Sequence, residues 1–140
     1  MSLQAKNVTK IFGSQKALDT VSFEIKTGEI VGFLGPNGAG KSTMMMIITG
    51  YIKQNSGEVL VNGMNISNQK DLKEVKKQIG YLPEHNPLYL DMYVKEYLNF
   101  AAKVYGIKGN VLKKSAENII DITGLGNEQH KKIGALSKGY

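Results

Sequence analysis

The chain has 140 residues, enough for one ordinary domain, and its 41% hydrophobic content is typical of a globular protein. It has no cysteine, which excludes disulfides and thiolate metal sites, and no apolar run approaches the roughly 20 residues that a membrane helix needs. Its 18 basic and 12 acidic residues give a net charge of +6, which is compatible with an anionic partner. The lysines, however, are scattered or follow predicted helical faces, so the simpler interpretation is a solvated surface.

Strand patterns dominate the first part of the chain. Residues 3–12 and 17–26 are predicted to form two strands around a turn at Gly13. From Val21 onward the second strand alternates apolar and polar side chains, the pattern of a half-buried strand. Residues 30–34, IVGFL, form a short continuous apolar run that ends at Gly-Pro, which indicates a strand buried on both faces.

Helix and strand patterns then alternate. After a glycine-rich loop, no helix breaker occurs before Gly50, so a helix is predicted there, with its three consecutive methionines packed in the core. Residues 57–63 form a predicted strand between glycines. Residues 68–78 are predicted to form a charged helix with Asn68 as its N-cap, and residues 79–82 a short strand.

The remaining residues follow a helical pattern. From Tyr93 the apolar residues recur every three to four positions until Gly106, which predicts one amphipathic helix, and residues 111–122 predict a second. The chain is therefore expected to comprise an α/β part at residues 1–85 and a mainly helical part at residues 86–140.

Residues 35–43, GPNGAGKST, match the phosphate-binding pattern G-x-x-x-x-G-K-[ST] in full. The glycines allow successive backbone N–H groups to point at a polyphosphate, and the following helix directs the positive end of its dipole to the same place. Lys41 can reach the β- and γ-phosphates, and the Ser42 hydroxyl can ligate Mg²⁺, which requires hard oxygen ligands. The candidate nucleotide ligands in this loop are Gly35, Asn37, Gly38, Ala39, Gly40, Lys41, Ser42 and Thr43.

Together with the residues on either side, this loop resembles the ATP-binding subunit of ATP-binding cassette (ABC) transporters. Residues 17–43 are similar to the family's approach to its phosphate loop, and residues 56–63 to the strand after the loop helix. The segment NVTKIFG at residues 7–13 resembles the family's adenine-stacking segment, which implies that Phe12 stacks on the base. The resemblance covers nearly the whole chain. It implies an α/β fold of the P-loop NTPase type: an ABC-type core with an N-terminal antiparallel β part and a helical subdomain, with the C-terminal part missing.

Two later segments resemble family motifs and depart from them in part. Residues 79–89, IGYLPEHNPLY, stand where the family has its glutamine loop, with Glu84 in place of Gln, which implies a carboxylate near Mg²⁺ and leaves its coupling role open. Residues 136–140, LSKGY, resemble the family signature LSGGQ, which implies that Ser137 and Gly139 contact the γ-phosphate on a partner subunit. The sequence around Glu84, YLPEHNPLYLDMYVKEYL, is especially similar to ABC-2-type exporter ATPases, including gliding-motility-associated ones.

The resemblance places further family features after Tyr140: an apolar strand ending in an Asp that orders Mg²⁺, a Glu that polarises the attacking water, and a later His. No catalytic residue is therefore assigned within the chain, and we expect it to bind Mg-ATP with hydrolysis absent or very weak. We expect the chain to be a portion of a longer one. Because the missing strand would lie beside residues 30–34, we also expect an unpaired edge there, lower stability than the complete domain and a tendency to associate.

The resemblance implies an ATP-binding subunit that uses ATP and Mg²⁺ to power export through a membrane-spanning partner. It also implies a head-to-tail homodimer or heterodimer of ATPase subunits, located in the cytoplasm at the inner face of the cell membrane, with no nucleic-acid partner. Two alternatives stay open. Another P-loop enzyme, such as a small kinase or GTPase, would need an arginine-rich lid or an N-K-x-D motif, and the sequence has neither. A non-transport ABC ATPase acting on nucleic acid or ribosomes is compatible with the charge of +6.

Overall fold

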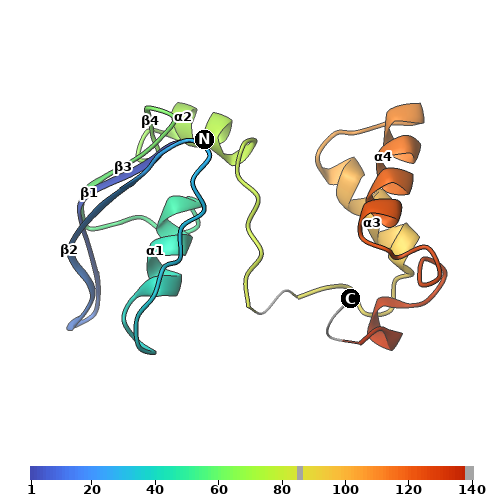
Figure 1. Ribbon diagram of the computed structural model, residues 1–140, viewed down its shortest axis with the longest axis horizontal. Coiled ribbons are helices and arrows are strands. Elements are labelled where there is room, and N and C mark those ends of the chain that lie inside the picture. Colours follow the sequence, from blue (N-terminus) through green and yellow to red (C-terminus); the bar gives the residue numbers. More distant parts are fainter. Residues whose placement is uncertain (85–86, 138–140) are drawn as a thin grey trace. The chain divides into compact units, whose positions relative to one another are not determined.

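The computed structural model describes residues 1–84 and 87–137 of the chain. Two compact units make up the chain, a first unit at Met1–Leu82 and a second unit at Pro83–Tyr140. The first unit contains a sheet with helices, and the second unit is helical (Figure 1). Across the described ranges, no helix combines the length and the apolar character needed to cross a membrane.

The first unit is built on a four-stranded antiparallel sheet with the strand order β2-β1-β3-β4. Its strands are β1 (Leu3–Phe12), β2 (Gln15–Ile25), β3 (Ser56–Val61) and β4 (Met64–Asn65). The three longer strands confirm the strands predicted at these places, and β4 is too short to produce a sequence pattern. Gly13, in the turn between β1 and β2, has a φ of 57°, a left-handed conformation that glycine adopts readily and that confirms the predicted turn.

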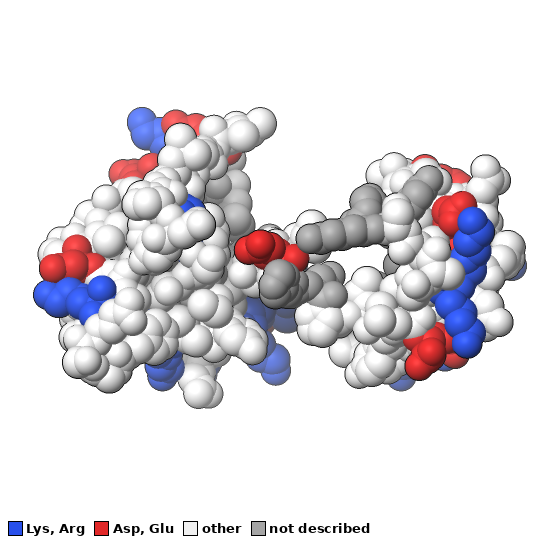
Figure 2. Space-filling view, turned by 90° about the horizontal axis from the view of Figure 1, so that it is seen from below, with Lys and Arg blue, Asp and Glu red and all other residues white. Residues whose placement is uncertain are grey.

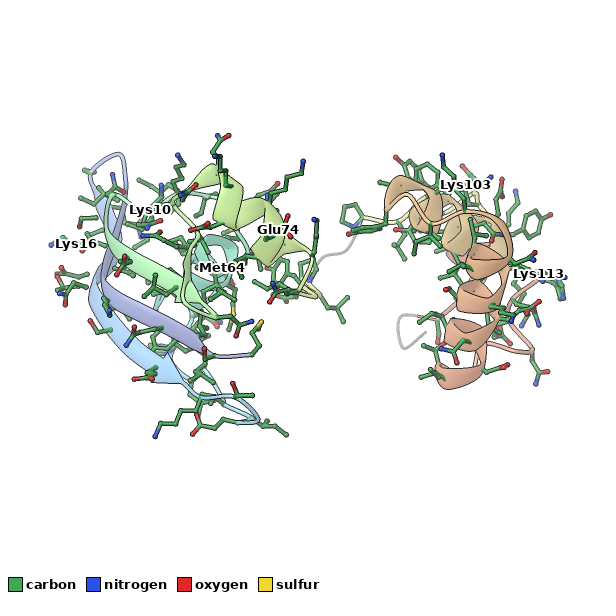
Figure 3. All side chains as sticks on the ribbon, turned by 90° about the horizontal axis from the view of Figure 1, so that it is seen from above. Lys10, Lys16, Met64, Glu74, Lys103 and Lys113 are labelled. Carbon is green, nitrogen blue, oxygen red and sulfur yellow. The ribbon has the colours of Figure 1, made fainter. Side chains whose placement is uncertain are left out.

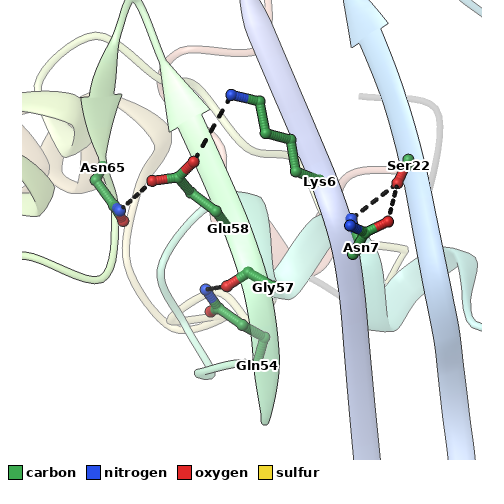
Figure 4. A network of polar contacts seen from close by, with 7 residues as sticks. All are labelled: Lys6, Asn7, Ser22, Gln54, Gly57, Glu58 and Asn65. Atoms are coloured by element: carbon green, nitrogen blue, oxygen red, sulfur yellow. Dashed lines mark hydrogen bonds and ion pairs between the residues drawn. The ribbon is translucent and has the colours of Figure 1, made fainter.

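Polar contacts join the strands of this sheet (Figure 4). Glu58 on β3 accepts a hydrogen bond from the Asn65 side chain at 2.8 Å and lies 3.8 Å from the Lys6 ammonium, so it connects three strands. The Asn7 N–H donates to the Ser22 hydroxyl at 2.8 Å, at a point where the β1–β2 register shifts. Asn7 has a φ of 50°, and this side-chain contact replaces a regular ladder hydrogen bond at the bulge.

The core of the first unit is formed by the sheet together with α1 (Lys41–Ile48) and α2 (Gln69–Lys76). Met44 is fully buried, as predicted for the methionines, whereas Met45 is 38% exposed and departs from the core role predicted for all three. Consecutive helix positions point about 100° apart, so three adjacent methionines cannot all face the sheet. The buried cluster comprises Leu3, Ala5, Val8, Leu18, Met44, Ile47, Ile48, Val59, Val61, Ile66 and Val75.

Helix α2 begins where the sequence predicts. Asn68 is its N-cap, and the Asn68 side chain accepts a hydrogen bond from the Lys70 N–H at 2.9 Å. Asp71 lies in the first turn and basic residues lie in the last turn, as the helix dipole favours. The residues of the segment itself therefore determine where this helix starts.

Two predicted strands do not form. Residues 30–34 and 79–82 have no strand partner among the described residues. Ile30 and Leu34 are 102% and 92% exposed, and Leu82 is 82% exposed. The prediction of a strand buried on both faces is therefore wrong, because a strand is stable only when a neighbour pairs with its backbone N–H and C=O groups.

The second unit contains α3 (Val94–Val104) and α4 (Gly109–Ile122), which pack against each other, and the 3-10 helix η1 (Ile133–Ala135). Both α-helices confirm the predicted helical segments. Gly106 follows α3 with a φ of 77°, as expected of a glycine that ends a helix. The buried apolar residues of this unit are Val94, Ala116, Ile120 and Ile133.

A short antiparallel contact joins the residues before α3 to those that enter η1. Tyr93 and Lys132 form an isolated bridge, and the Ile133 N–H donates to the Met92 carbonyl at 2.9 Å. These residues are far apart in the sequence, and no local pattern predicts their pairing. The contact fixes the backbone that leads to Ser137.

Charged side chains are spread over the surface of both units. In the view of Figure 2, basic and acidic side chains lie close together at the edges of the first unit, and the second unit carries a line of basic side chains with acidic ones near it. Ion pairs join the exposed Lys77 to Glu74, and Lys131 to the partly buried Glu128, each at 2.8 Å. These pairs agree with the interpretation of the lysines as solvated surface.

Candidate nucleotide-binding site

The loop at residues 35–40 leads directly into the N-terminus of α1. Gly38 and Gly40 have φ angles of 84° and 83°, in the left-handed region that other residues rarely adopt. Gly40 is the N-cap of α1, and its carbonyl accepts a helical hydrogen bond from the Met44 N–H at 2.9 Å. The first N–H groups of α1, which have no partner within the helix, therefore lie next to the loop.

Gly40 also packs directly against β2. A β-carbon at this position would collide with the Ala17 carbonyl oxygen and would lie 2.7 Å from Cδ2 of Leu18. Only glycine permits this approach, so the loop is fixed to the sheet at Ala17. The phosphate-binding pattern predicts a glycine at position 40, and the structure adds packing against the sheet as a second reason for it.

The Lys41 ammonium is held by the loop itself. Its Nζ donates to the carbonyl oxygens of Gly35 and Pro36 at 2.6 and 2.7 Å. The side chain of Lys41 therefore folds back over the loop instead of extending into solvent. A positive charge lies in this way beside the N-terminus of α1, and both features attract a phosphate group.

The start of α1 favours an anion. The helix has no acidic residue in its first turn, so none of its own side chains neutralises the positive end of its dipole there. Ser42 is exposed in this turn, and Thr43 beside it is partly buried. An exposed hydroxyl is a hard oxygen donor of the kind that Mg²⁺ prefers, and phosphate oxygens supply more of the same kind. The residues present therefore fit an Mg²⁺-nucleotide.

Phe12 is the last residue of β1, at the turn into β2. Phe12 pairs with Gln15 across the turn, and Gln15 is two residues from Ala17, against which Gly40 packs. Two strand residues span about 7 Å, which is the backbone separation of Gln15 from Ala17 along β2. Phe12 is 48% exposed, and its ring is accessible to a ligand.

Lys10 lies beside Phe12, and the sequence patterns do not single it out. Its Nζ lies 5.0 Å from the centroid of the Phe12 ring, within the range of a cation–π contact, and donates to the Lys53 carbonyl at 2.6 Å. Figure 3 labels Lys10, together with Lys16 from the other strand of the hairpin. The position of Lys10 two residues before Phe12 is a sequence signal for this contact, since residues two apart in a strand lie on the same face.

An exposed ion pair lies on β2 beyond the turn. The Lys16 ammonium is 3.1 Å from the Asp19 carboxylate, and the Thr20 hydroxyl donates to the same carboxylate at 3.1 Å. The hydrogen bond from Lys16, and then that from Thr20, lower the pKa of the Asp19 carboxyl below its ordinary value. Because the Lys16 ammonium is paired with the Asp19 carboxylate, we do not propose that Lys16 binds a phosphate group.

The other predicted site residues lie in the second unit. Glu84 is exposed at a bend, and Ser137 is exposed in the segment after η1. Gly139 lies outside the described residues. In the described part of the chain, no three His, Asp or Glu side chains are grouped so that they could hold a metal ion. Phe12 and the phosphate loop thus both belong to the first unit, and the assignments of Phe12, Glu84 and Ser137 rest on the resemblance.

An antiparallel sheet joined to a phosphate loop, with a helical unit after it, is the architecture of ATP-binding cassettes, and solved cassettes match the chain with TM-scores of 0.80 and 0.82. The ABC transporter family matches residues 18–140, most of the chain. The chain belongs to this family.

Known members are similar in both sequence and structure. An ABC transporter ATP-binding protein of Methanocaldococcus jannaschii is 39% identical over 137 residues, which are 98% of this chain and 47% of that protein. The linearmycin resistance ATP-binding protein LnrL of Bacillus subtilis is 37% identical over 98% of this chain and 43% of its own length. A solved dimeric ATP-binding cassette, in a post-hydrolysis state bound to ADP and Pi, has a TM-score of 0.81 and 28% identity, and covers 98% of this chain and 64% of its own. The chain spans about half the length of the curated relatives it matches.

Proposed function

We propose that the chain is the ATP-binding subunit of an ABC transporter, which binds Mg-ATP and, in the complete protein, hydrolyses it to drive export through a partner membrane protein. One observation carries the proposal: the loop at Gly38 and Gly40 delivers the N-terminus of α1 and the Lys41 ammonium to the same place. Backbone N–H groups, a helix dipole and a lysine together favour a polyphosphate there. Membership of the family supports ATP as the nucleotide.

The site residues have separate tasks in this proposal. Lys41 and the backbone N–H groups of the loop hold the phosphates, and Thr43 adds a hydroxyl. Ser42 holds Mg²⁺, which neutralises phosphate charge when it is bound. Phe12 stacks on adenine, because an aromatic face holds a planar base with little demand for hydrogen bonds. The loop residues whose backbone surrounds the phosphates are Gly35, Asn37, Gly38, Ala39 and Gly40.

We assign residues 1–85 to the ATP-binding core and residues 86–140 to the helical subdomain. In this assignment Glu84 is a candidate water-mediated ligand of Mg²⁺. Ser137 and Gly139 act on the nucleotide of a second ATPase subunit in a head-to-tail dimer. The relative bound to ADP and Pi is dimeric, which supports a dimer of this chain.

The proposed location is the cytoplasm, at the inner face of the cell membrane, where the subunit meets its membrane partner. No residue of this chain is assigned to polarise the attacking water, and we propose that the chain binds ATP without efficient hydrolysis of its own.

Binding of Mg-ATP to a Lys41→Ala variant tests the site. The substitution removes the ammonium at the phosphate loop, and we expect the affinity to fall about tenfold or more, since hydrogen bonds to charged groups contribute about 1.5–3 kcal/mol. Lys73→Ala, at an exposed position on α2, is the control and should bind as the wild type does. Equal affinities of the Lys41→Ala variant and the wild type in isothermal titration calorimetry would refute the assigned site.

Purification of the full-length protein from membranes tests the transport role. We expect it to co-purify with membrane-spanning subunits. A non-transport ABC ATPase would instead bind nucleic acid or ribosomes, with an affinity that falls steeply as salt is raised. Recovery of the protein with nucleic acid, and without a membrane subunit, would favour that alternative.

A further inference from the structure

The Lys10 ammonium lies over the Phe12 ring and is held there by a hydrogen bond to the backbone. Its Nζ is 5.0 Å from the ring centroid, and the same Nζ donates to the Lys53 carbonyl at 2.6 Å. A cation within about 6 Å of an aromatic centroid is attracted to the ring face. A hydrogen bond from a charged donor is also stronger than one between neutral groups. The two contacts together hold the ammonium on one side of the ring.

The segment that supplies this carbonyl is itself bound to β1. The Asn55 N–H donates to the Thr9 carbonyl at 2.9 Å, and the Asn55 side chain accepts a hydrogen bond from the Ile11 N–H at 2.8 Å. Lys53 therefore belongs to a segment that is attached to β1 on both sides of Lys10. Backbone contacts thus set the position of the Lys10 ammonium, in contrast to a lysine on an open surface.

The Phe12 ring keeps an accessible side. Its residue is 48% exposed, and the ammonium covers one face of the ring. A planar base can stack on the opposite face. The ammonium draws the electrons of the ring toward itself, which weakens the repulsion between the ring and the base. It also restrains the ring before the base arrives, so less side-chain freedom is lost on binding.

We infer that Lys10 is a positioning residue for adenine, which holds the Phe12 ring from behind in the orientation that receives the base. The inference rests on the proposed function, since it needs a nucleotide at the phosphate loop. The register of the hairpin supports it, because Lys10 pairs with Leu18, beside the Ala17 carbonyl against which Gly40 packs. Lys10 thus contacts the ring and not the base, and the ring stacks on the base.

Two ligands separate an effect on the base from an effect on the phosphates. In the full-length protein, calorimetry gives the Kd of Mg-ATP and of Mg-tripolyphosphate for the wild type, Lys10→Met, Lys10→Arg and a control, Lys73→Met. We expect Lys10→Met to weaken ATP binding about two- to fivefold, the range of an exposed cation–π contact, and to leave tripolyphosphate binding unchanged. Lys10→Arg keeps a cation over the ring and should restore most of the affinity, and Lys73→Met should match the wild type.

Dependence on Phe12 provides the second test. In a Phe12→Ala background, Lys10→Met should no longer change the ATP affinity, because the ring through which Lys10 acts is gone. Equal losses of ATP and tripolyphosphate affinity in Lys10→Met would overturn the inference, and so would an effect on ATP that persists without the ring. Either result leaves the proposed function intact. A folded wild-type protein that does not bind Mg-ATP would instead refute the proposed function itself.

Discussion

Gly40 packs so closely against Ala17 that no side chain fits between them, because a β-carbon on Gly40 would collide with the Ala17 carbonyl oxygen. Gly40 also has a φ of 83°. One residue therefore permits the left-handed turn into α1 and fixes the phosphate loop to β2. The left-handed backbone disfavours a residue with a side chain, and the collision with Ala17 excludes one.

A Gly40→Ala variant is expected to lose stability and affinity for Mg-ATP together. The left-handed backbone alone costs about 1–3 kcal/mol for a residue with a β-carbon, and the collision with Ala17 adds to it. Gly80→Ala is the matched control in the same unit, because Gly80 has no left-handed φ and a β-carbon there would meet no other atom within 4 Å. Urea denaturation that gives the two variants equal stability would contradict the packing of the loop on β2.

The adjacent methionines of α1 are expected to differ in their contributions to stability. Met44 is fully buried, and Met44→Ala should cost about 2–5 kcal/mol through lost burial and a cavity. Met45 is 38% exposed, and Met45→Ala should cost less than about 1 kcal/mol. Thermal denaturation of the two variants measures the difference, and similar losses would show that the helix presents another face to the sheet.

Substitution of the N-cap of α2 is expected to weaken that helix. Asn68→Ala removes the acceptor of the Lys70 N–H and should cost about 0.5–2 kcal/mol, whereas Asn68→Ser keeps an acceptor and should cost less. Hydrogen exchange of the α2 amides reports the effect locally. If the Ala and Ser variants exchange at the same rate, the Asn68 side chain does not cap the helix.

The Lys16–Asp19 pair is expected to make a small contribution to stability that depends on pH. The pKa of the folded Asp19 carboxyl lies below its ordinary value of 3.8, so the contribution is present above that value and is lost as the pH falls through the lower pKa of the folded chain. In the Asp19→Asn variant, the free energy of unfolding should therefore fall less between neutral and acidic pH than it does in the wild type. The effect should shrink in high salt, because exposed pairs are screened, and a difference that is unchanged by salt would argue against the ion pair as its cause.

Local sequence predicts the helices well because their determinants are local. Asn68 caps α2 through an amide only two residues away, and the glycine after α3 ends that helix through its own backbone conformation. The phosphate loop is predictable for the same reason, since its glycines, Lys41 and Ser42 lie within one short segment. Burial of Met44 rather than Met45 depends on how the helix is rotated toward the sheet, and the sequence of the helix alone does not specify this.

Residues 30–34 show that a local sequence pattern does not predict strand pairing. Their apolar run has the composition of a buried strand, but composition cannot supply the neighbour that a strand needs. No described strand pairs with them, and Ile30, Val31 and Leu34 are exposed, while Phe33 packs against the core. Residues 79–82 are likewise unpaired, with Tyr81 and Leu82 exposed and Ile79 packed against the core. Pairing depends on contacts between distant segments, and a local pattern carries no information about their presence.

The sequence by itself determined the phosphate loop, the hairpin with its aromatic residue, the capped helix and the family, because each depends on residue types at short, fixed spacings. Only the tertiary structure decided that Gly40 meets Ala17, that Lys10 reaches both Phe12 and Lys53, and that two apolar segments stay unpaired. These relationships join residues that lie apart in the sequence or depend on how a strand bulges. Packing and backbone pairing between segments fix them, and those interactions exist only in the folded chain.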